Sequence, residues 1–390
     1  MRRDVLLLSA AAFTSSASLR ATDPLLPLIA EDYGVSPGAA AAAVTAFALA
    51  YGLLQVVCGP LGDRYGRYRT IAAAAFISAF GSAACALAPD LKTLVAARFL
   101  AGATIGAFIP LSLAWIGDSF PYEQRQPVLA RFLIGQMVGI GFGTALAGAL
   151  AERYGWRAIF VLLAIALLAI ALLLTLEARR QPRPAARAGI AQSFARMPRL
   201  LGERAVRGLL AIGFSEGFLI FGALAFVALH FQRRFGVGPG AAGTLVAVYA
   251  LGGLAYAAVA PRALRRFGEI GLATLGGGAL ALGYALLAAS PWLALAALGL
   301  AAIGGGFYMF HTTLQTRLTQ VAPGARGSAV ALFATFLFMG QASGVWLASH
   351  LADAVGIAPV FGVSALGLVV LAVAFRRRLV LAAVSSPRAP

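Results

Sequence analysis

Long apolar stretches follow one another along the whole chain, separated by short polar connections. A helix that crosses a bilayer needs about 20 apolar residues, and twelve stretches approach or reach that length. They cover residues 5–30, 38–60, 70–88, 93–117, 128–150, 158–176, 206–231, 241–261, 270–289, 292–315, 328–350 and 359–375. Because 61% of the residues are hydrophobic and only 12% are charged, no soluble fold of this size could bury them. The sequence therefore predicts an all-α membrane protein with twelve transmembrane helices.

The basic residues lie mainly in alternate connections. An even number of spans places both termini on one side. The termini and connections on that side carry 23 Lys and Arg residues, against 5 on the opposite side. The positive-inside rule then places both termini in the cytoplasm. The net charge of +17 does not indicate a nucleic-acid partner, because the arginines lie in short tethers and not on one folded face.

The two halves of the chain repeat each other. The aligned residues, at a shift of 202 or 201, are 33–40 with 235–242, 64–66 with 266–268, and Gly139 and Gly143 with Gly340 and Gly344. We therefore expect two pseudo-symmetric six-helix bundles, 1–176 and 206–375, joined by a cytoplasmic linker at 177–205 and followed by a cytoplasmic tail at 376–390. Within the linker, 190–201 is either an amphipathic segment on anionic headgroups or a solvated tether. Two such bundles enclose a cleft that rocking opens to either side.

The connection between the second and third stretches is short, basic and interrupted by glycine. It reads G-P-L-G-D-R-Y-G-R-Y-R from Gly59 to Arg69. This pattern resembles the loop between helices 2 and 3 of major facilitator superfamily transporters, G-x-L-a-D-R-x-G-R-(K/R)-(K/R), and departs from it only at Tyr68. The matching residues are Gly59, Leu61, Asp63, Arg64, Gly66, Arg67 and Arg69. Together with the two repeats, the resemblance covers essentially the whole chain and implies the major facilitator fold.

This loop has a mechanical interpretation as a gate. We expect Asp63 to cap the helix that begins near Gly327, and the arginines to pair with acids such as Asp118 and Glu123. Such contacts would hold the cytoplasmic side shut in one state of the transport cycle.

Arg20, Asp23 and Arg98 lie inside predicted helices of the first half, where a charge at mid-bilayer costs about 2.5–3.5 kcal/mol. Arg20 and Asp23 are three residues apart, so they share one helix face and can pair. Asp23 with Pro27 resembles the Asp-x-x-x-Pro of drug–proton antiporters, in which this carboxylate helps to couple proton uptake to export. The alternative is a structural pair with Arg20. Arg98 with Gly102 resembles the superfamily's R-x-x-x-G motif, which implies an arginine in the cleft that acts on a carboxylate such as Asp23. The alternative is snorkelling to the interface.

Four further polar residues lie inside predicted helices. Glu216 has no Lys or Arg within a helical turn, and an unpaired carboxyl in apolar surroundings suits a proton carrier or a contact for a cationic solute. The alternative is a structural hydrogen bond to a neighbouring helix. His311 lies in a polar patch of the tenth stretch, where a lone histidine has either a structural or a site role. Gln136 and Gln341 are amides that line the cleft or bridge helices.

The fifth stretch carries a stripe of small residues for close helix packing. The glycines of this kind are Gly135, Gly139 and Gly143, with Gly340 and Gly344 in the matching stretch of the second half. The fifth stretch resembles the antiporter motif of drug exporters, G-x-x-x-G-P-x-x-G-G. Thr144 replaces the proline and Ala147 replaces the first terminal glycine. The departure weakens the export assignment and leaves the fold prediction unchanged.

The sequence contains no recognisable phosphate-binding loop, metal-ligand spacing or catalytic triad. We therefore expect no enzymatic activity, no metal and no cofactor, and a proton gradient as the energy source. The resemblance implies a monomeric, multi-pass secondary transporter of small molecules in the inner (plasma) membrane. The few buried charges favour proton-coupled export of amphipathic or cationic compounds. The alternatives are import or exchange of a sugar or small organic anion held by Arg20 or Arg98, and a non-transporting sensor, which the intact loop from Gly59 to Arg69 disfavours.

Overall fold

The computed structural model describes residues 3–180, 197–322 and 325–385, and within them all side chains except those of 122–127, 130 and 383–385. Every regular element in these ranges is a helix. Eleven helical segments here are long and apolar enough to cross a membrane. The longest, of 51 residues, is broken at Gly268 and supplies two spans, so the predicted twelve spans are present.

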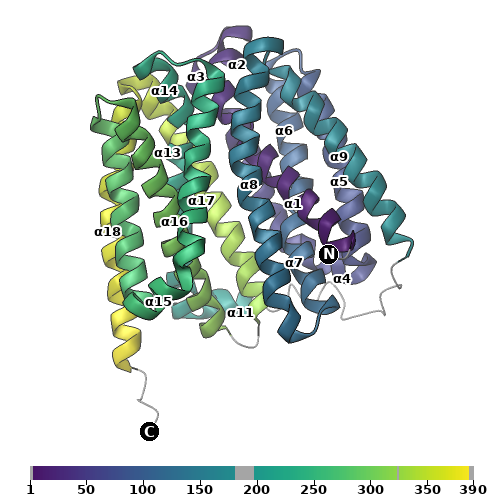
Figure 1. The fold of residues 1–390 in the computed structure, drawn as a ribbon, viewed down its shortest axis with the longest axis vertical. Helices are drawn as coiled ribbons and strands as arrows, with labels where there is room; N and C mark the ends of the chain where they lie inside the picture. The colour runs from purple at the N-terminus through teal and green to yellow at the C-terminus, as the bar shows by residue number, and fades with distance from the viewer. Residues whose placement is uncertain (1–2, 181–196, 323–324, 386–390) are drawn as a thin grey trace.

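The first half contains six spans, drawn from purple to blue in Figure 1. In chain order they are α1 (Arg3–Arg20), η1 (Asp23–Leu25) and α2 (Leu26–Asp32); α3 (Pro37–Ala40) and α4 (Ala42–Tyr65); α5 (Arg67–Ala86); α6 (Leu91–Ile105) and α7 (Phe108–Ser119); α8 (Tyr122–Tyr154); and α9 (Arg157–Ala178). Three of these spans are thus divided into shorter helices.

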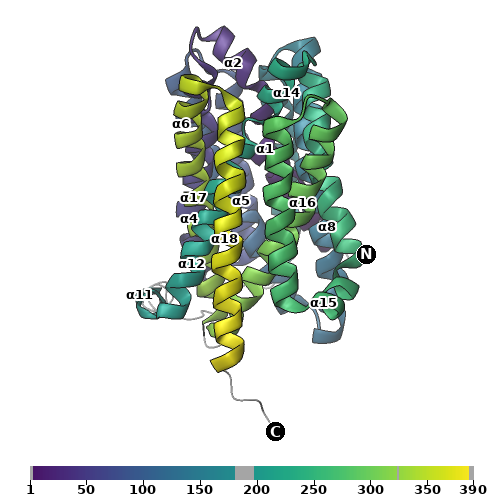
Figure 2. The ribbon, with the colours of Figure 1, turned by 90° about the vertical axis from the view of Figure 1, so that its left-hand side faces the viewer.

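The second half follows the short helix α11 (Met197–Gly202) and lies beside the first half in Figure 1. Its spans are α12 (Arg204–Glu216), the π-helix η2 (Gly217–Phe221), α13 (Gly222–Leu224) and α14 (Val227–Phe235); the two legs of α15 (Pro239–Ala289); α16 (Leu293–Val321); α17 (Arg326–Val355); and α18 (Ile357–Ser385). Both ends of the chain lie toward the lower end of the bundle, and α2 and α14 lie at the upper end (Figures 1 and 2). We call these ends the terminus side and the far side.

The backbone repeats itself as the sequence does. Within the described ranges six residues have positive φ, all of them glycine, and they form three pairs. The pairs are Gly34 with Gly236 (φ 63° and 66°), Gly66 with Gly268 (91° and 63°), and Gly155 with Gly356 (79° and 92°). The spacings are the 202 or 201 residues of the sequence repeat. Glycine adopts this conformation without the steric penalty of other residues, so each half uses the same turns.

Four of the predicted packing glycines lie directly on the backbone of a neighbouring helix. The contacts are Gly139 on Phe13 and Gly143 on Ala17, between α8 and α1, and Gly340 on Phe214 and Gly344 on Phe218, between α17 and the seventh span. A Cβ atom on any of the four would overlap that backbone, so the absence of a side chain sets how closely the helices approach. At Gly135 an added Cβ would lie 3.3 Å from the carbonyl oxygen of Ser9, a looser contact.

The two halves meet on the far side and at mid-height. On the far side the Gln232 amide of α14 donates a hydrogen bond of 3.1 Å to the carbonyl of Pro24, beside the break in the first span. At mid-height the Thr335 hydroxyl of α17 donates a hydrogen bond of 2.9 Å to the carbonyl of Gly52 in α4. The two halves are thus joined by hydrogen bonds at both heights.

Several boundaries differ from the predicted ones. The helix α18 continues to Ser385 instead of ending at 375, because the residues that follow favour helix and extend it beyond the apolar stretch. The predicted break at 262–269 shrinks to Gly268, since the residues before it stay helical. In the predicted linker, α9 reaches Ala178 and α12 begins at Arg204, while 181–196, with part of the proposed amphipathic segment, lies outside the described residues.

Candidate functional site

The first span is interrupted beside its two charged residues. The helix α1 ends at Arg20, and a 3₁₀ turn that starts at Asp23 precedes α2. Pro24 in this turn has no amide hydrogen to continue a helical ladder. Nη1 of Arg20 lies 3.1 Å from Oδ2 of Asp23, and the two residues are 2% and 0% exposed. The predicted pair is therefore formed, and each charge offsets the burial of the other.

Arg98 of α6 points into the helix bundle. Both of its terminal nitrogens donate to the carbonyl of Ser18 at 3.3 Å, and its guanidinium carbon lies 3.9 Å from the centre of the Phe47 ring. The residue is 1% exposed, so it does not snorkel to the interface. It also lies close enough to Asp23 for the two charges to interact. The first-half charges thus form one buried group.

Aromatic residues of the second half continue this group across the interface between the halves. The guanidinium carbon of Arg20 lies 4.7 Å from the centre of the Phe221 ring, at the end of the π-helix η2. Tyr249 of α15 is buried close enough to both Arg20 and Glu216 for their charges to act on its hydroxyl. Tyr249 is therefore within electrostatic range of the charged groups of both halves.

The seventh span is also irregular beside its charge. Glu216 is the last residue of α12, and the π-helix η2 follows it directly. Short π-helical segments often occur at functional sites. Glu216 is 0% exposed, and its Oε2 lies 3.1 Å from Nδ1 of His311 in α16. The His311 ring stacks on Phe307, with ring centres 4.7 Å apart, and packs at 5.2 Å against Phe333. The sequence offered Glu216 no nearby partner, whereas the fold supplies one from 95 residues away.

Several buried polar atoms around these charges have no hydrogen-bond partner within the described part of the chain. They are Oγ of Ser18, Oγ1 of Thr22, Oδ1 of Asp23, Nε of Arg98, Oε1 of Glu216, Oη of Tyr249 and both amide atoms of Gln341. Buried polar groups are normally bonded, so such a concentration marks a place that can bind a proton, water or a polar solute. It lies on spans 1, 4, 7, 8 and 11.

The two predicted glutamines differ in position. Gln341 of α17 is 1% exposed and lies beside the π-helix, since a Cβ on Gly217 would come within 3.0 Å of its backbone nitrogen. Gln136 of α8 is half-buried and has no hydrogen bond to the residues that the structure describes. The fold therefore brings Gln341, and not Gln136, next to the helix that carries Glu216.

The basic loop between the second and third spans is held to the fourth span through Arg67. Its Nη1 lies 2.7 Å from Oδ2 of Asp118 and also donates to the carbonyl of Ala114, while its Nη2 lies 3.3 Å from Oδ1 of Asp63. The expected pairing of an arginine with Asp118 is present. Asp63 binds Arg67 within its own loop and does not cap α17, which begins at Arg326.

The expectation that Asp63 caps α17 was wrong, because its carboxylate is paired with Arg67 of its own loop. Of the other matching residues, Gly66 takes the positive φ that separates α4 from α5. Arg64 is exposed over the Tyr65 ring, and Arg69 is half-buried. Gly59 has open space where a side chain would point. Glu123 lies outside the residues whose side chains are described.

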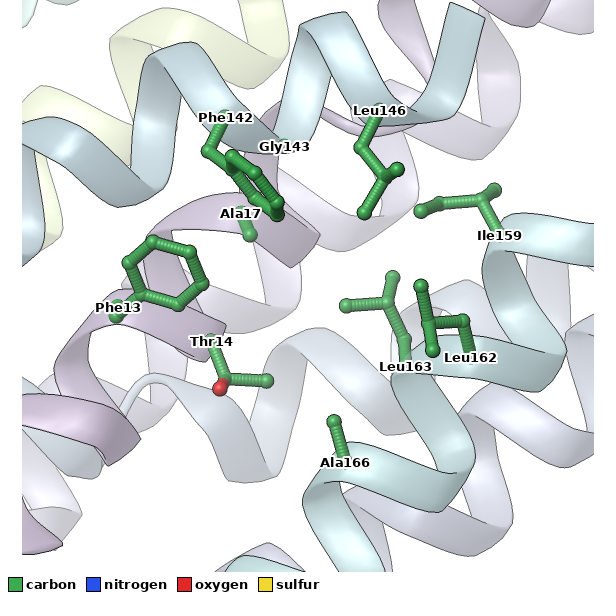
Figure 3. A pocket seen from close by; sticks show the side chains of 10 residues that line it. All are labelled: Phe13, Thr14, Ala17, Phe142, Gly143, Leu146, Ile159, Leu162, Leu163 and Ala166. Atoms are coloured by element: carbon green, nitrogen blue, oxygen red, sulfur yellow. The ribbon is translucent and has the colours of Figure 1, made fainter. Parts of the chain in front are cut away.

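An apolar pocket of about 220 Å³ lies between α1, α8 and α9 (Figure 3). Phe13, Phe142 and Leu162 are among the residues that line it. Its single hydroxyl, on Thr14, is already bonded to the carbonyl of Ala10 at 2.9 Å. The pocket therefore has no free polar group and is separate from the charged site.

Sequence reasoning missed the aromatic residues that join the two charged groups, Phe221 and Tyr249. Aromatic residues are frequent in all these spans, so their identity alone gave no signal. It also missed two acids on the far side, Glu152 and Asp353, which the repeat spacing of 201 would have paired.

Twelve spans in two pseudo-symmetric halves, with charges buried where the halves meet, form the architecture of a secondary membrane transporter. Residues 8–336 match the family model of the Major Facilitator Superfamily, and the chain belongs to that superfamily. Its named relatives are transporters and resistance proteins, in agreement with the expectation that it is not an enzyme.

Two of these relatives, both from bacteria, show how far the similarity extends. The uncharacterized MFS-type transporter YdgK of Bacillus subtilis (strain 168) is 30% identical over 224 residues, which are 55% of this chain and 55% of that protein. The lincomycin resistance protein of Streptomyces lincolnensis is 32% identical over 220 residues, 54% of this chain and 45% of that protein. The chain spans about half the length of these curated relatives.

Among solved structures, the fold resembles the partially occluded inward-open conformation of the xylose transporter XylE from E. coli. The TM-score is 0.73 at 17% identity, with 95% of each chain covered. At this identity the similarity concerns the fold alone.

Proposed function

We propose that the protein is a proton-coupled secondary transporter that exports small amphipathic or cationic compounds by alternating access. The observation that carries this proposal is the Glu216 carboxyl group. It is 0% exposed, one of its oxygens contacts His311, and the other has no partner in the described residues. The group formed by Arg20, Asp23 and Arg98 lies across the interface from it.

A proton and a cationic solute would bind at the same place, the Glu216 carboxylate. A buried carboxylate needs a neutralising partner, because an isolated charge in apolar surroundings is strongly disfavoured. A proton on Glu216, or a cationic solute against its free oxygen, would each supply that partner. The two then exclude each other, and mutual exclusion at one site is what an antiporter requires. Asp23 would take part through its own unpartnered oxygen.

The surroundings of Glu216 favour an amphipathic cation as the solute. The rings of Phe307 and Phe333 pack around His311, and Tyr249 lies nearby. Aromatic faces attract organic cations and bury apolar surface. The similarity to a lincomycin resistance protein supports export of a drug-like compound.

The proposed orientation bears on which side of the membrane the buried charges are reached from in this structure. The basic residues favour a cytoplasmic terminus side. The halves are in contact on the far side and at mid-height, which supports access to the buried charges from the cytoplasm. The protein would then be a multi-pass protein of the plasma membrane with both termini inside the cell.

Import or exchange of a sugar or small organic anion is the second candidate. The observation that favours it is Arg98, which has no carboxylate within hydrogen-bonding distance in the described part of the chain and whose Nε is unpartnered. An arginine with free donors can hold a carboxylate or hydroxyl groups. The similarity in fold to a xylose transporter is compatible with this alternative.

Susceptibility of cells with and without the gene separates the two candidates. In a host lacking its own efflux pumps, the proposal predicts that the gene raises resistance to the planar cation ethidium and to lincomycin. Glu216→Gln should abolish the resistance, whereas Glu31→Gln, at an exposed acid of α2, should keep it. Unchanged susceptibility together with increased uptake of xylose or benzoate would support the alternative.

A further inference from the structure

Two acids on the far side occupy equivalent positions in the two halves. Glu152 lies near the end of α8 and Asp353 near the end of α17, and they are related by the repeat spacing of 201 residues. Both are exposed to solvent. Neither belongs to the buried charged group described above.

Each acid reaches across to the start of a span in the opposite half. Oδ1 of Asp353 accepts a hydrogen bond from the backbone amide of Gly38 at 3.2 Å, and its Oδ2 accepts one from the hydroxyl of Ser36 at 2.5 Å. Oε1 of Glu152 accepts a hydrogen bond from the backbone amide of Gly240 at 2.8 Å. Gly38 and Gly240 are themselves equivalent residues, each one position after the proline that begins its span.

The same physical effect favours the contact of Asp353 with Gly38 and that of Glu152 with Gly240. The amides in the first turn of a helix have no acceptor within the helix, and the helix dipole favours a negative charge there. The glycines permit the approach, because a Cβ on Gly38 would overlap the Asp353 carboxylate and one on Gly240 would lie 2.7 Å from Oε2 of Glu152.

The two contacts also differ in one respect. The Ser36 hydroxyl adds a second hydrogen bond to Asp353, whereas the equivalent position in the second half is Gly238, which has no side chain to donate. Asp353 is therefore held by two donors, and Glu152 by one in the described residues.

We propose that Glu152 and Asp353 are a pair of symmetry-related latches that hold the far side closed and must release for it to open. The proposal rests on the alternating-access function put forward above. Since both carboxylates are exposed, water solvates them as soon as they leave the amides, so release is readily reversible. One latch runs from an acid of the first half to a span of the second, and the other from an acid of the second half to a span of the first. Together they oppose a rotation that would separate the two halves on the far side.

Distances between spin labels on the two halves test this directly. The two native cysteines, Cys58 and Cys85, are first replaced by serine. One label pair, Leu87→Cys with Trp292→Cys, reports on the far side, at positions that are 81% and 69% exposed. A second pair, Tyr65→Cys with Phe267→Cys, reports on the terminus side at equivalent positions of the two halves. The measurements use the full chain in lipid nanodiscs.

The latch proposal predicts reciprocal shifts of the two distances. Glu152→Ala should raise the ratio of far-side-open to far-side-closed molecules about threefold, and Asp353→Ala somewhat more, because it loses two donors. The double variant should raise the ratio about tenfold, since the two contacts are far enough apart to act independently. The far-side distance should lengthen while the terminus-side distance shortens. The control Glu31→Ala removes an exposed far-side charge and should change neither distance.

Identical distance distributions in the double variant and the parent would overturn the proposal. So would a longer far-side distance without a shorter terminus-side distance, because that would indicate local loosening. Glu152→Gln with Asp353→Asn keeps the shape of both side chains and should give a smaller shift in the same direction, which guards against effects of misfolding. The experiment needs no solute, so a failure to transport would count against the proposed function and leave this result standing.

Discussion

Nδ1 of His311 lies 3.1 Å from Oε2 of Glu216, at a point where the seventh span changes from α-helix to π-helix. The two residues come from α12 and α16, so the second half builds this pair by itself. The glutamate is 0% exposed, while the histidine side chain is 16% exposed. His311 is therefore the partly exposed member of the pair, and Glu216 is the fully buried one.

The first half has a pair of its own, built differently. Arg20 and Asp23 belong to one span and lie 3.1 Å apart at its break. Tyr249 is close to both Arg20 and Glu216, and Phe221 contacts the Arg20 guanidinium. A rocking motion that separates the halves would leave both pairs intact, because each lies within one half, and would change the contacts between them, such as that of Phe221 with Arg20.

Arg20 and Asp23 should stabilise the folded protein mainly because each neutralises the buried charge of the other. Asp23→Ala would leave Arg20 buried without its carboxylate, and breaking a buried pair in this way is destabilising by about 3–5 kcal/mol. The double variant Arg20→Met with Asp23→Ala removes both charges and should recover most of the loss. Thermal unfolding in detergent, followed by tryptophan fluorescence, measures the effect. A single variant as stable as the parent would show that Arg20 does not depend on Asp23.

The basic loop should matter for transport and not for folding. Among the described residues the Asp63 carboxylate is paired with Arg67, and Arg67 is also held by Asp118. We expect Asp63→Asn to lower the transport rate several-fold while expression stays normal, because the contact that Asp63 makes when the terminus side closes is lost. Arg262→Gln, at an exposed arginine of α15 outside this loop, serves as the control. Unchanged transport by Asp63→Asn in membrane vesicles would remove the gating role of this loop.

The packing glycines should be intolerant of even a methyl group. Gly139→Ala and Gly340→Ala would each place a Cβ onto the backbone of the neighbouring helix, and overpacking of this kind costs about 1–3 kcal/mol. Gly278→Ala, in a span where nothing lies within 4 Å of the added Cβ, is the matched control and should be neutral or slightly stabilising. Melting temperatures of the three variants test this. Equal values for all three would show that the helices can move apart freely.

Much of the fold could be predicted because lipid leaves few choices for the backbone. Apolar stretches of this length must form helices, and the basic residues order them across the membrane. The repeat predicted the pseudo-symmetry, which the positive-φ glycines such as Gly66 and Gly268 show in the backbone itself. The Arg20–Asp23 pair was also predictable, because three residues along a helix fix its geometry.

The contacts between distant spans were beyond prediction. Glu216 and His311 are 95 residues apart, and nothing in their local sequences states which helix faces meet. The expectation that Asp63 caps α17 failed because the sequence does not state which partner the carboxylate takes, and in the structure that partner is Arg67. The latches at Glu152 and Asp353 depend on side chains reaching across the interface, although the repeat spacing relates the two acids.

The most direct test of the account is proton flux through the purified protein. Proteoliposomes containing the pH-sensitive dye pyranine would be exposed to ethidium, lincomycin, xylose and benzoate in turn, with the parent protein, Glu216→Gln, His311→Ala and the control Glu31→Gln. The account predicts proton movement in exchange for ethidium or lincomycin, loss of that movement in Glu216→Gln, strong reduction in His311→Ala, and no change in the control. Proton movement with xylose or benzoate alone, or full coupled flux in Glu216→Gln, would contradict it.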